Sequence, residues 1–274
     1  FSFKETNPSK EKLLEVRSVS VNYRSHERGI FSKGKSVEAV SNVSLDIRKG
    51  ERLGLVGESG CGKSTLTRTI LGLQSASSGY IKFDGKEVSK YDNNFKKNIQ
   101  VVFQDPYGSF NPRQKIGRLI TEPFFTLGRE APPETEQKII AQKMLKEVGL
   151  SSESIEKYIH EFSGGQRQRI AIARALVIQP KLIIFDEAVS ALDVSIRSQI
   201  LKLISDLTER YGLSYLFISH DLTVIENITE NCLVMKNGKI VERGQTKHIL
   251  RDPKNEYTLS LINAAPKFPN FLHA

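Results

Sequence analysis

A glycine-rich loop near the start of the chain has the residue types and spacing of a phosphate site. The run Gly57-Glu58-Ser59-Gly60-Cys61-Gly62-Lys63-Ser64 fits the pattern G-x-x-x-x-G-K-[ST] and follows the apolar run 52–56; the segment after it has Leu66, Ile70 and Leu73 on one side. Glycines let backbone N–H groups turn toward an anion, and the following helix points its positive end at the same anion. The sequence therefore predicts a loop that grips the phosphates of a nucleotide.

Individual positions of this loop have separate tasks. Lys63 would reach the outer phosphates, and the hydroxyl of Ser64, with Thr65 beside it, lies where Mg²⁺ bridges two phosphates. A disulfide between Cys61 and Cys232 would block this chemistry, so both cysteines are expected to be reduced. Contacts to the nucleotide are expected throughout the loop, from Gly57, Glu58, Ser59, Gly60, Cys61, Gly62, Lys63, Ser64 and Thr65.

Two carboxylates follow a second apolar run, 182–185. Charges at the end of a buried strand are costly unless a cation or a reactive water lies nearby. Asp186 is therefore expected to bind Mg²⁺, and Glu187 to orient or deprotonate the water that attacks the γ-phosphate. Without the glycine loop, two solvated acids would be the simpler interpretation.

A serine-glycine helix start provides a second place for an anion. Ser163 is the expected N-cap of Ser163-Gly164-Gly165-Gln166, and Ile170, Ala171 and Ala173 form the buried side of the helix. One chain has little use for two grips on one γ-phosphate, unless the second faces a nucleotide held by another subunit. This arrangement indicates a dimer.

One histidine completes the group. His220 follows the apolar run 215–218 and is expected at the same sheet edge as Asp186. Taken alone it would be an ordinary surface residue; beside the other groups it is predicted to contact and sense the γ-phosphate.

Two kinds of strand are expected to position these residues. Apolar and polar residues alternate around Val19–Tyr23, around 43–47 and up to Phe83, which predicts half-buried antiparallel strands. Continuous apolar runs at 53–56, 101–103, 182–185 and 215–218 predict a parallel sheet covered by helices on both faces.

The remaining elements are a helical insertion and a hairpin. Strand signals stop between 112 and 161, where a helix is expected from Glu134 to Val148, ending at Gly149. The segment 234–241 reads as two strands joined by an Asn237-Gly238 turn. The predicted class is α/β.

Composition excludes several classes of protein. The chain has 274 residues, 39% hydrophobic residues, 2 cysteines and a net charge of +9. It is therefore neither disordered nor disulfide-stapled, and no apolar run approaches the roughly 18 to 20 residues that cross a bilayer. The charged N-terminus lacks a signal peptide's apolar core, which indicates the cytosol, and the scattered basic residues form no block typical of nucleic-acid binding.

The motifs together resemble the ATP-binding subunit of an ABC transporter. Phe162-Ser163-Gly164-Gly165-Gln166, which we call the signature segment, resembles the family's signature motif. Gln104 resembles its glutamine loop, and Ser190-Ala191-Leu192-Asp193 resembles its dimer-contacting loop. His220 matches its switch histidine, and Tyr23 matches its adenine-stacking aromatic residue. Phe162 stands where leucine is commoner, and Ala188 where proline is usual; neither substitution removes a reactive group.

The resemblance implies a P-loop NTPase core of the ABC type, with a mostly parallel sheet, an antiparallel β subdomain and a helical insertion. It implies a nucleotide-binding domain at 1–250, with a helical subdomain at about 105–165, and a C-terminal tail at 251–274. It also implies that Gln104 is a metal ligand, that Asp193 contributes to the nucleotide site, and that ATP and Mg²⁺ bind between two cassettes.

Three segments resemble the oligopeptide, dipeptide and nickel importer branch: 105–113, 188–196, and Tyr257-Thr258-Leu259-Ser260-Leu261. No cysteine follows Cys232, which matches the cassette type without a cysteine-rich C-terminal segment, or the second half of a fused double cassette. The cargo, the natural N-terminus and the choice between two identical and two different cassettes stay open.

The resemblance implies partners as well. These are a transmembrane permease, a second cassette and, indirectly, an extracytoplasmic solute-binding protein, with the chain peripheral on the cytoplasmic face of the inner membrane and no nucleic acid bound. The alternative is a soluble ABC-type ATPase that acts on nucleic acid or ribosomes. Such proteins usually carry a long coiled-coil insertion, and the helical insertion here lacks sustained heptads.

Overall fold

The computed structural model describes residues 8–24, 36–88 and 93–264, and the chain divides into two compact units. Among the described residues, we call 93–217 the helical unit, and 8–24, 36–88 and 218–264 the loop unit. The chain passes from one to the other within β8 (Ser214–Ser219), whose six residues are all buried, as the apolar run 215–218 predicts.

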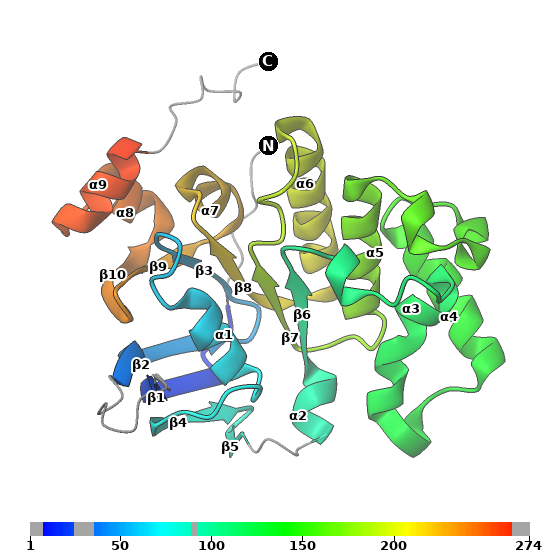
Figure 1. Cartoon of the computed structure of the whole chain (residues 1–274), viewed down its shortest axis with the longest axis horizontal. Coiled ribbons are helices and arrows are strands. Elements are labelled where there is room, and N and C mark those ends of the chain that lie inside the picture. Colours follow the sequence, from blue (N-terminus) through cyan, green and yellow to red (C-terminus); the bar gives the residue numbers. More distant parts are fainter. Residues whose placement is uncertain (1–7, 25–35, 89–92, 265–274) are drawn as a thin grey trace, which may run out of the picture. The chain divides into compact units, whose positions relative to one another are not determined.

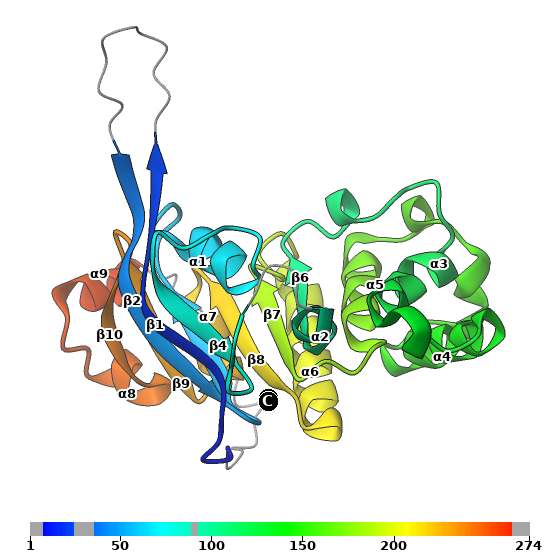
Figure 2. The same ribbon diagram turned by 90° about the horizontal axis from the view of Figure 1, so that it is seen from below.

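An antiparallel sheet forms one part of the loop unit. Its strand order is β2-β1-β4-β5, formed by β1 (Lys12–Arg24), β2 (Ser36–Arg48), β4 (Ser78–Phe83) and β5 (Lys86–Glu87). Figure 2 shows β1 and β2 as two long neighbouring ribbons. Val19, Val21 and Val43 are each at most 1% exposed, so the alternating pattern correctly identified the buried face.

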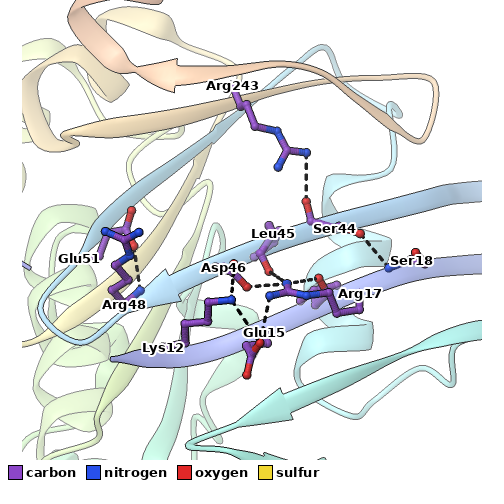
Figure 3. Close-up of polar contacts among 11 residues, drawn as sticks. Lys12, Glu15, Arg17, Ser18, Ser44, Leu45, Asp46, Arg48, Glu51 and Arg243 are labelled. Atoms are coloured by element: carbon purple, nitrogen blue, oxygen red, sulfur yellow. Dashed lines mark hydrogen bonds and ion pairs between the residues drawn. The ribbon is translucent and has the colours of Figure 1, made fainter. Parts of the chain in front are cut away.

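Ion pairs tie β1 to β2 on the other face of this sheet (Figure 3). Glu15 and Asp46 are register partners, an unfavourable placement for two carboxylates. Lys12 and Arg17 each pair with both acids, which removes the repulsion. Burial raises the pKa of Asp46, but hydrogen bonds from Arg17 and Lys12 outweigh it and hold that pKa below its usual value.

The rest of the loop unit surrounds two parallel strands. β3 (Arg52–Val56) is fully buried and pairs in parallel with β9 (Asn231–Lys236), which forms an antiparallel hairpin with β10 (Lys239–Gln245). Asn237 and Gly238 have φ of 47° and 79°, the left-handed pair that this hairpin turn requires. Figure 1 shows α8 (Thr246–Arg251) and α9 (Glu256–Ala264) beside β10.

One expectation for the helix after the glycine loop was wrong. Helix α1 spans Lys63–Ile70 and buries Leu66 and Ile70 completely, but Leu73 is 66% exposed. Gly72, at φ 71°, ends the helix before Leu73 can continue its apolar side.

The helical unit combines two parallel strands with a group of helices. β6 (Ile99–Phe103) pairs in parallel with β7 (Leu182–Asp186), as predicted. Residues 112–161 contain one isolated bridge, between Lys115 and Tyr158, and no strand. The α-helices are α2 (Asn93–Asn98), α3 (Ile116–Thr121), α4 (Glu134–Glu147), α5 (Gly164–Leu176) and α6 (Val194–Tyr211).

Helices α3, α4 and α5 pack on one another (Figure 1). The predicted helix from Glu134 is α4, which ends before Gly149 at φ 75°. Tyr107–Ser109, a 3-10 turn, precedes α3. The 3-10 segment Glu122–Glu130 joins α3 to α4, and Ser152–Glu156 and Ile159–Glu161 lie between α4 and α5. Among the described residues, no helix is both long enough and apolar enough to cross a membrane.

Candidate functional site

The glycine loop is pressed against neighbouring backbone, which explains two of its glycines. A Cβ on Gly57 would lie 2.2 Å from the carbonyl oxygen of Met235, and one on Gly62, at φ 111°, would lie 2.4 Å from that of Ala39. Gly60 also has a positive φ, 80°, but faces open space. The loop also accepts a hydrogen bond from the Gly238 N–H at the carbonyl of Cys61, 2.8 Å long. Only glycine fits the two tight positions.

Lys63 lies against the inside of this loop. Its side chain is buried, and its Nζ donates to the carbonyl oxygens of Gly57 at 2.7 Å and Glu58 at 2.9 Å. The Cys61 thiol lies 3.9 Å from the same nitrogen, and burial raises the pKa of this thiol. Cys61 and Cys232 are both free, as expected. A buried ammonium at the start of α1 suits a phosphate chain.

Two other predicted residues belong to the loop unit. Tyr23, near the end of β1, is 38% exposed and places its hydroxyl 3.4 Å from Thr65 Oγ1. The structure therefore brings this aromatic ring to the start of α1. His220 is exposed and directly follows β8, and Asp221 after it caps α7 (Leu222–Ile228) by accepting from the Thr223 N–H.

The predicted carboxylates and Gln104 lie at the same end of two paired strands in the helical unit. Phe103 at the end of β6 is the register partner of Asp186 at the end of β7, so Gln104 and Glu187 are the first residues after two paired strands. Glu187 has φ 51° and begins a turn in which Ser190 Oγ donates to its carbonyl oxygen at 2.9 Å. This turn directs the chain away from the sheet immediately after the carboxylates.

The signature segment caps its own helix. Ser163 Oγ accepts from the Gln166 N–H at 3.4 Å, and Gln166 Oε1 accepts from the Ser163 N–H at 3.0 Å. This reciprocal pair leaves Ser163, Gly164 and Gln166 exposed at the start of α5. Phe162, which departs from the family pattern, is buried.

The segment 190–193 lies next to this helix start, where a Cβ on Gly164 would be 3.9 Å from Leu192 Cδ2. A Cβ on Gly165 would be 2.5 Å from Ile196 Cγ2 on α6. Asp193 caps α6 by accepting from the Ile196 N–H at 2.9 Å. The segment 190–193 and the start of α5 therefore form one surface.

Sequence reasoning missed two arginines on α5. The Arg174 guanidinium lies 4.4 Å from the centroid of the Phe110 ring and donates to Ser109 O at 2.9 Å and Ser109 Oγ at 3.0 Å. The Arg167 guanidinium lies 4.8 Å from the Tyr107 ring centroid. Arg167 and Arg174 are seven residues apart, which places both on one side of the helix. This spacing is the sequence signal that could have identified them. Together these two arginines hold the segment 105–113 against α5.

The predicted residues are divided between the two units. The loop unit holds Tyr23, Gly57–Thr65 and His220; the helical unit holds Gln104, Ser163–Gln166, Asp186, Glu187 and Asp193. The described residues contain no cluster of three or more His, Cys, Asp or Glu that could hold a metal by itself. The predicted ligands are the hydroxyl of Ser64, the amide of Gln104 and the carboxylate of Asp186. All three offer oxygen atoms, which fit Mg²⁺, and Mg²⁺ usually completes its coordination with phosphate oxygens rather than with protein ligands alone.

Comparison with known proteins decides the family. A family model described as ABC transporter matches residues 40–190. The chain belongs to the ABC transporter family. The cassette is 42% identical to the dipeptide transport ATP-binding protein DppF of Haemophilus influenzae, over 97% of this chain and 82% of that protein. It is 45% identical to the oligopeptide transport ATP-binding protein AppF of Bacillus subtilis, over 95% of this chain and 80% of that protein.

Solved cassettes share the fold. CbiO1 of Clostridium perfringens, part of the ABC transporter complex cbiONQ, has a TM-score of 0.75 at 27% identity, covering 93% of this chain and 95% of that one. The ATP-binding cassette MJ0796, solved as a dimer with ADP and Pi, has a TM-score of 0.74 at 27% identity, covering 85% and 98%. The predicted α/β class and ABC-type core are thus confirmed.

These relatives show the class of activity. The cassette is an ATPase subunit of an ABC importer in the oligopeptide and dipeptide branch. The alternative of a soluble ATPase that acts on nucleic acid or ribosomes receives no support from them.

Proposed function

We propose that this cassette hydrolyses ATP to drive the uptake of peptides through a membrane permease. DppF and AppF are named for dipeptide and oligopeptide transport, and identities of 42% and 45% over nearly the whole chain support the same cargo class here. In this proposal 1–250 is the nucleotide-binding domain, about 105–165 its helical subdomain, and 251–274 a tail.

The observation that carries the proposal is the glycine loop with its buried lysine. Gly57 and Gly62 are forced by contacts with backbone carbonyls, and Lys63 is held on the loop's own carbonyl oxygens. N–H groups of Gly57 to Thr65 would surround the phosphates, and Lys63, held on the loop carbonyls, would donate to a phosphate oxygen. Tyr23 would stack on the adenine.

Hydrolysis is assigned to residues that follow the parallel strands. Glu187 would orient or deprotonate the attacking water, and His220 would contact the γ-phosphate. Oxygens of Ser64, Gln104 and Asp186 would hold Mg²⁺, which supplies charge neutralisation at the β- and γ-phosphates.

A second cassette, identical or related, would complete each site. Its Ser163–Gln166 would close on the ATP held by Gly57–Thr65 of the first, with Asp193 beside it. The start of α5 supports this role, because Ser163, Gly164 and Gln166 are exposed there. Closure would depend on ATP, and hydrolysis would reopen the pair.

The surface proposed for the permease lies in the helical unit. A hollow of about 450 Å³ is lined by residues that include Gln100, Gln114, Arg118, Phe125 and Arg174, and Phe125 is 86% exposed. The adjoining segment from Gln104 to Arg113 would pass closure to the permease. The cassette would thus be peripheral on the cytoplasmic face, with a solute-binding protein acting from the other side.

Calorimetry with a slowly cleaved ATP analogue tests the site. The unaltered chain should bind the analogue, Lys63→Ala should lose most of the affinity, and Glu187→Gln should keep binding but hydrolyse ATP at least about a hundredfold more slowly. With ATP, Glu187→Gln should also accumulate as a closed dimer in gel filtration. Normal turnover by Glu187→Gln, or no binding by the unaltered chain, would refute the proposal.

The partner is tested by stimulation of the ATPase. Turnover should rise with a peptide permease and its solute-binding protein in membranes. A rise with DNA or ribosomes instead would favour the nucleic-acid alternative.

A further inference from the structure

The peptide group between Gly57 and Glu58 is held at both of its polar ends. Its carbonyl oxygen accepts from Lys63 Nζ at 2.7 Å. Its N–H donates to the hydroxyl oxygen of Tyr257 at 3.1 Å, 199 residues further along the chain. Rotation of this peptide would break both bonds, so the tyrosine hydroxyl also fixes the carbonyl that holds the lysine.

Tyr257 is well fixed for this task. Its side chain is buried, and Lys236 Nζ lies 4.5 Å from the centroid of its ring. Its own N–H donates to Asn255 Oδ1 at 2.9 Å, at the start of α9. Burial raises the pKa of its hydroxyl, so this group is protonated and neutral in the physiological range.

The start of α9 is in turn attached to β10. The two oxygens of Glu242 accept from the N–H groups of Lys254 at 2.8 Å and Asn255 at 3.3 Å. A continuous set of hydrogen bonds thus connects β10, the start of α9, Tyr257 and the glycine loop.

We infer that Tyr257 is a positioning residue of the ATP site, which sets the Gly57–Glu58 peptide and through it the ammonium of Lys63. The inference rests on the proposed function and adds a residue from outside the glycine loop. Lys63 would contact the phosphates in both the bound and the reacting state, so its displacement weakens ATP binding more than it slows the chemical step.

Tyr257→Phe tests this directly, because it removes the hydroxyl and keeps the ring. Loss of one hydrogen bond should weaken binding of the ATP analogue, and raise KM for ATP, roughly three- to tenfold, with kcat within about twofold of the unaltered chain. The matched control is Tyr80→Phe, because Tyr80 is 42% exposed on β4 and should leave all three values unchanged. Thermal unfolding of both variants, without nucleotide, accompanies the binding data.

Two further measurements separate positioning from general support. Amide exchange should speed up at Glu58 in Tyr257→Phe, while the amides of β1 and β2 keep their protection. Glu242→Ala, which removes the attachment of α9 to β10, should reproduce the rise in KM.

Each outcome is decisive. Unchanged affinity in Tyr257→Phe, or a weaker affinity matched by a general loss of amide protection, overturns the inference while the proposed ATPase stands. Failure of the unaltered chain to bind the analogue overturns the proposed function instead.

Discussion

The glycine loop of the loop unit and the signature segment of the helical unit are both proposed to contact ATP, yet they are held in different ways. The loop is shaped by residues distant in sequence: the carbonyls of Ala39 and Met235 and the hydroxyl of Tyr257. The signature segment is shaped by its own Ser163 and Gln166. A phosphate-binding backbone can therefore be fixed from outside or from within, and the two kinds should respond differently to substitution.

The largest effect is expected at Gly62. Gly62→Ala combines a left-handed φ of 111° with a backbone contact of 2.4 Å, so ATP binding should weaken roughly a hundredfold or more. Gly60→Ala is the control, because its φ of 80° is similar but its Cβ would face open space; about tenfold or less is expected. Calorimetry measures both, and equal losses would mean that strain, not external contact, shapes the loop.

The self-capped helix start gives the next largest effect. Ser163→Ala should cost about 1 kcal/mol of stability and lower ATPase turnover at least about tenfold, since the hydroxyl is also proposed to face the partner's nucleotide. Ser151→Ala is matched to it, because Ser151 also caps a helical turn, accepting from the Glu153 N–H, and should leave turnover unchanged. Equal turnover in the two variants would remove Ser163 from the site.

A smaller effect is expected where α5 holds the segment 105–113. Arg174→Met should leave the ATPase of the isolated cassette near normal but reduce its stimulation by the permease several-fold, because the contacts with Ser109 and Phe110 are lost. Arg210→Met removes an exposed arginine paired with Glu147 in the same unit and should leave stimulation intact. Full stimulation of Arg174→Met would show that the segment transmits nothing through this residue.

The smallest effect is on acid stability. The pKa of Asp46 is lowered in the folded chain, so its stabilising contribution is present above its unfolded value of about 4 and is lost as pH falls through the lower folded value. Asp46→Asn should therefore flatten the fall in unfolding temperature below about pH 4. Calorimetric melts across this range measure it, and an unchanged slope would contradict the ion-pair account.

Glu156 in the helical unit serves as the comparison. Its pKa is lowered to about 2 by hydrogen bonds from Lys115 and Lys138, but its side chain is 54% exposed, against 34% for that of Asp46. Salt screens exposed pairs more strongly, so the change caused by Glu156→Gln should shrink more at high ionic strength than that caused by Asp46→Asn.

Features that depend on neighbouring residues were predictable. The capping pair at Ser163 and Gln166, the Asn237-Gly238 turn and the end of α4 at Gly149 all follow from side chains within a few positions of one another. The wrong expectation for Leu73 also has a local cause. The helical period predicts which side of α1 is apolar, but Gly72 ends the helix before Leu73.

The sequence by itself determined which groups are proposed to perform the chemistry of this cassette, because the glycine loop, the two carboxylates and Ser163–Gln166 are each recognisable from a few adjacent residues. The tertiary structure alone decided what supports them: Tyr257 behind the Gly57–Glu58 peptide, and Arg167 and Arg174 against Tyr107 and Phe110. Such contacts join residues far apart in the chain, and packing of the whole unit, which no local pattern encodes, sets which of them meet.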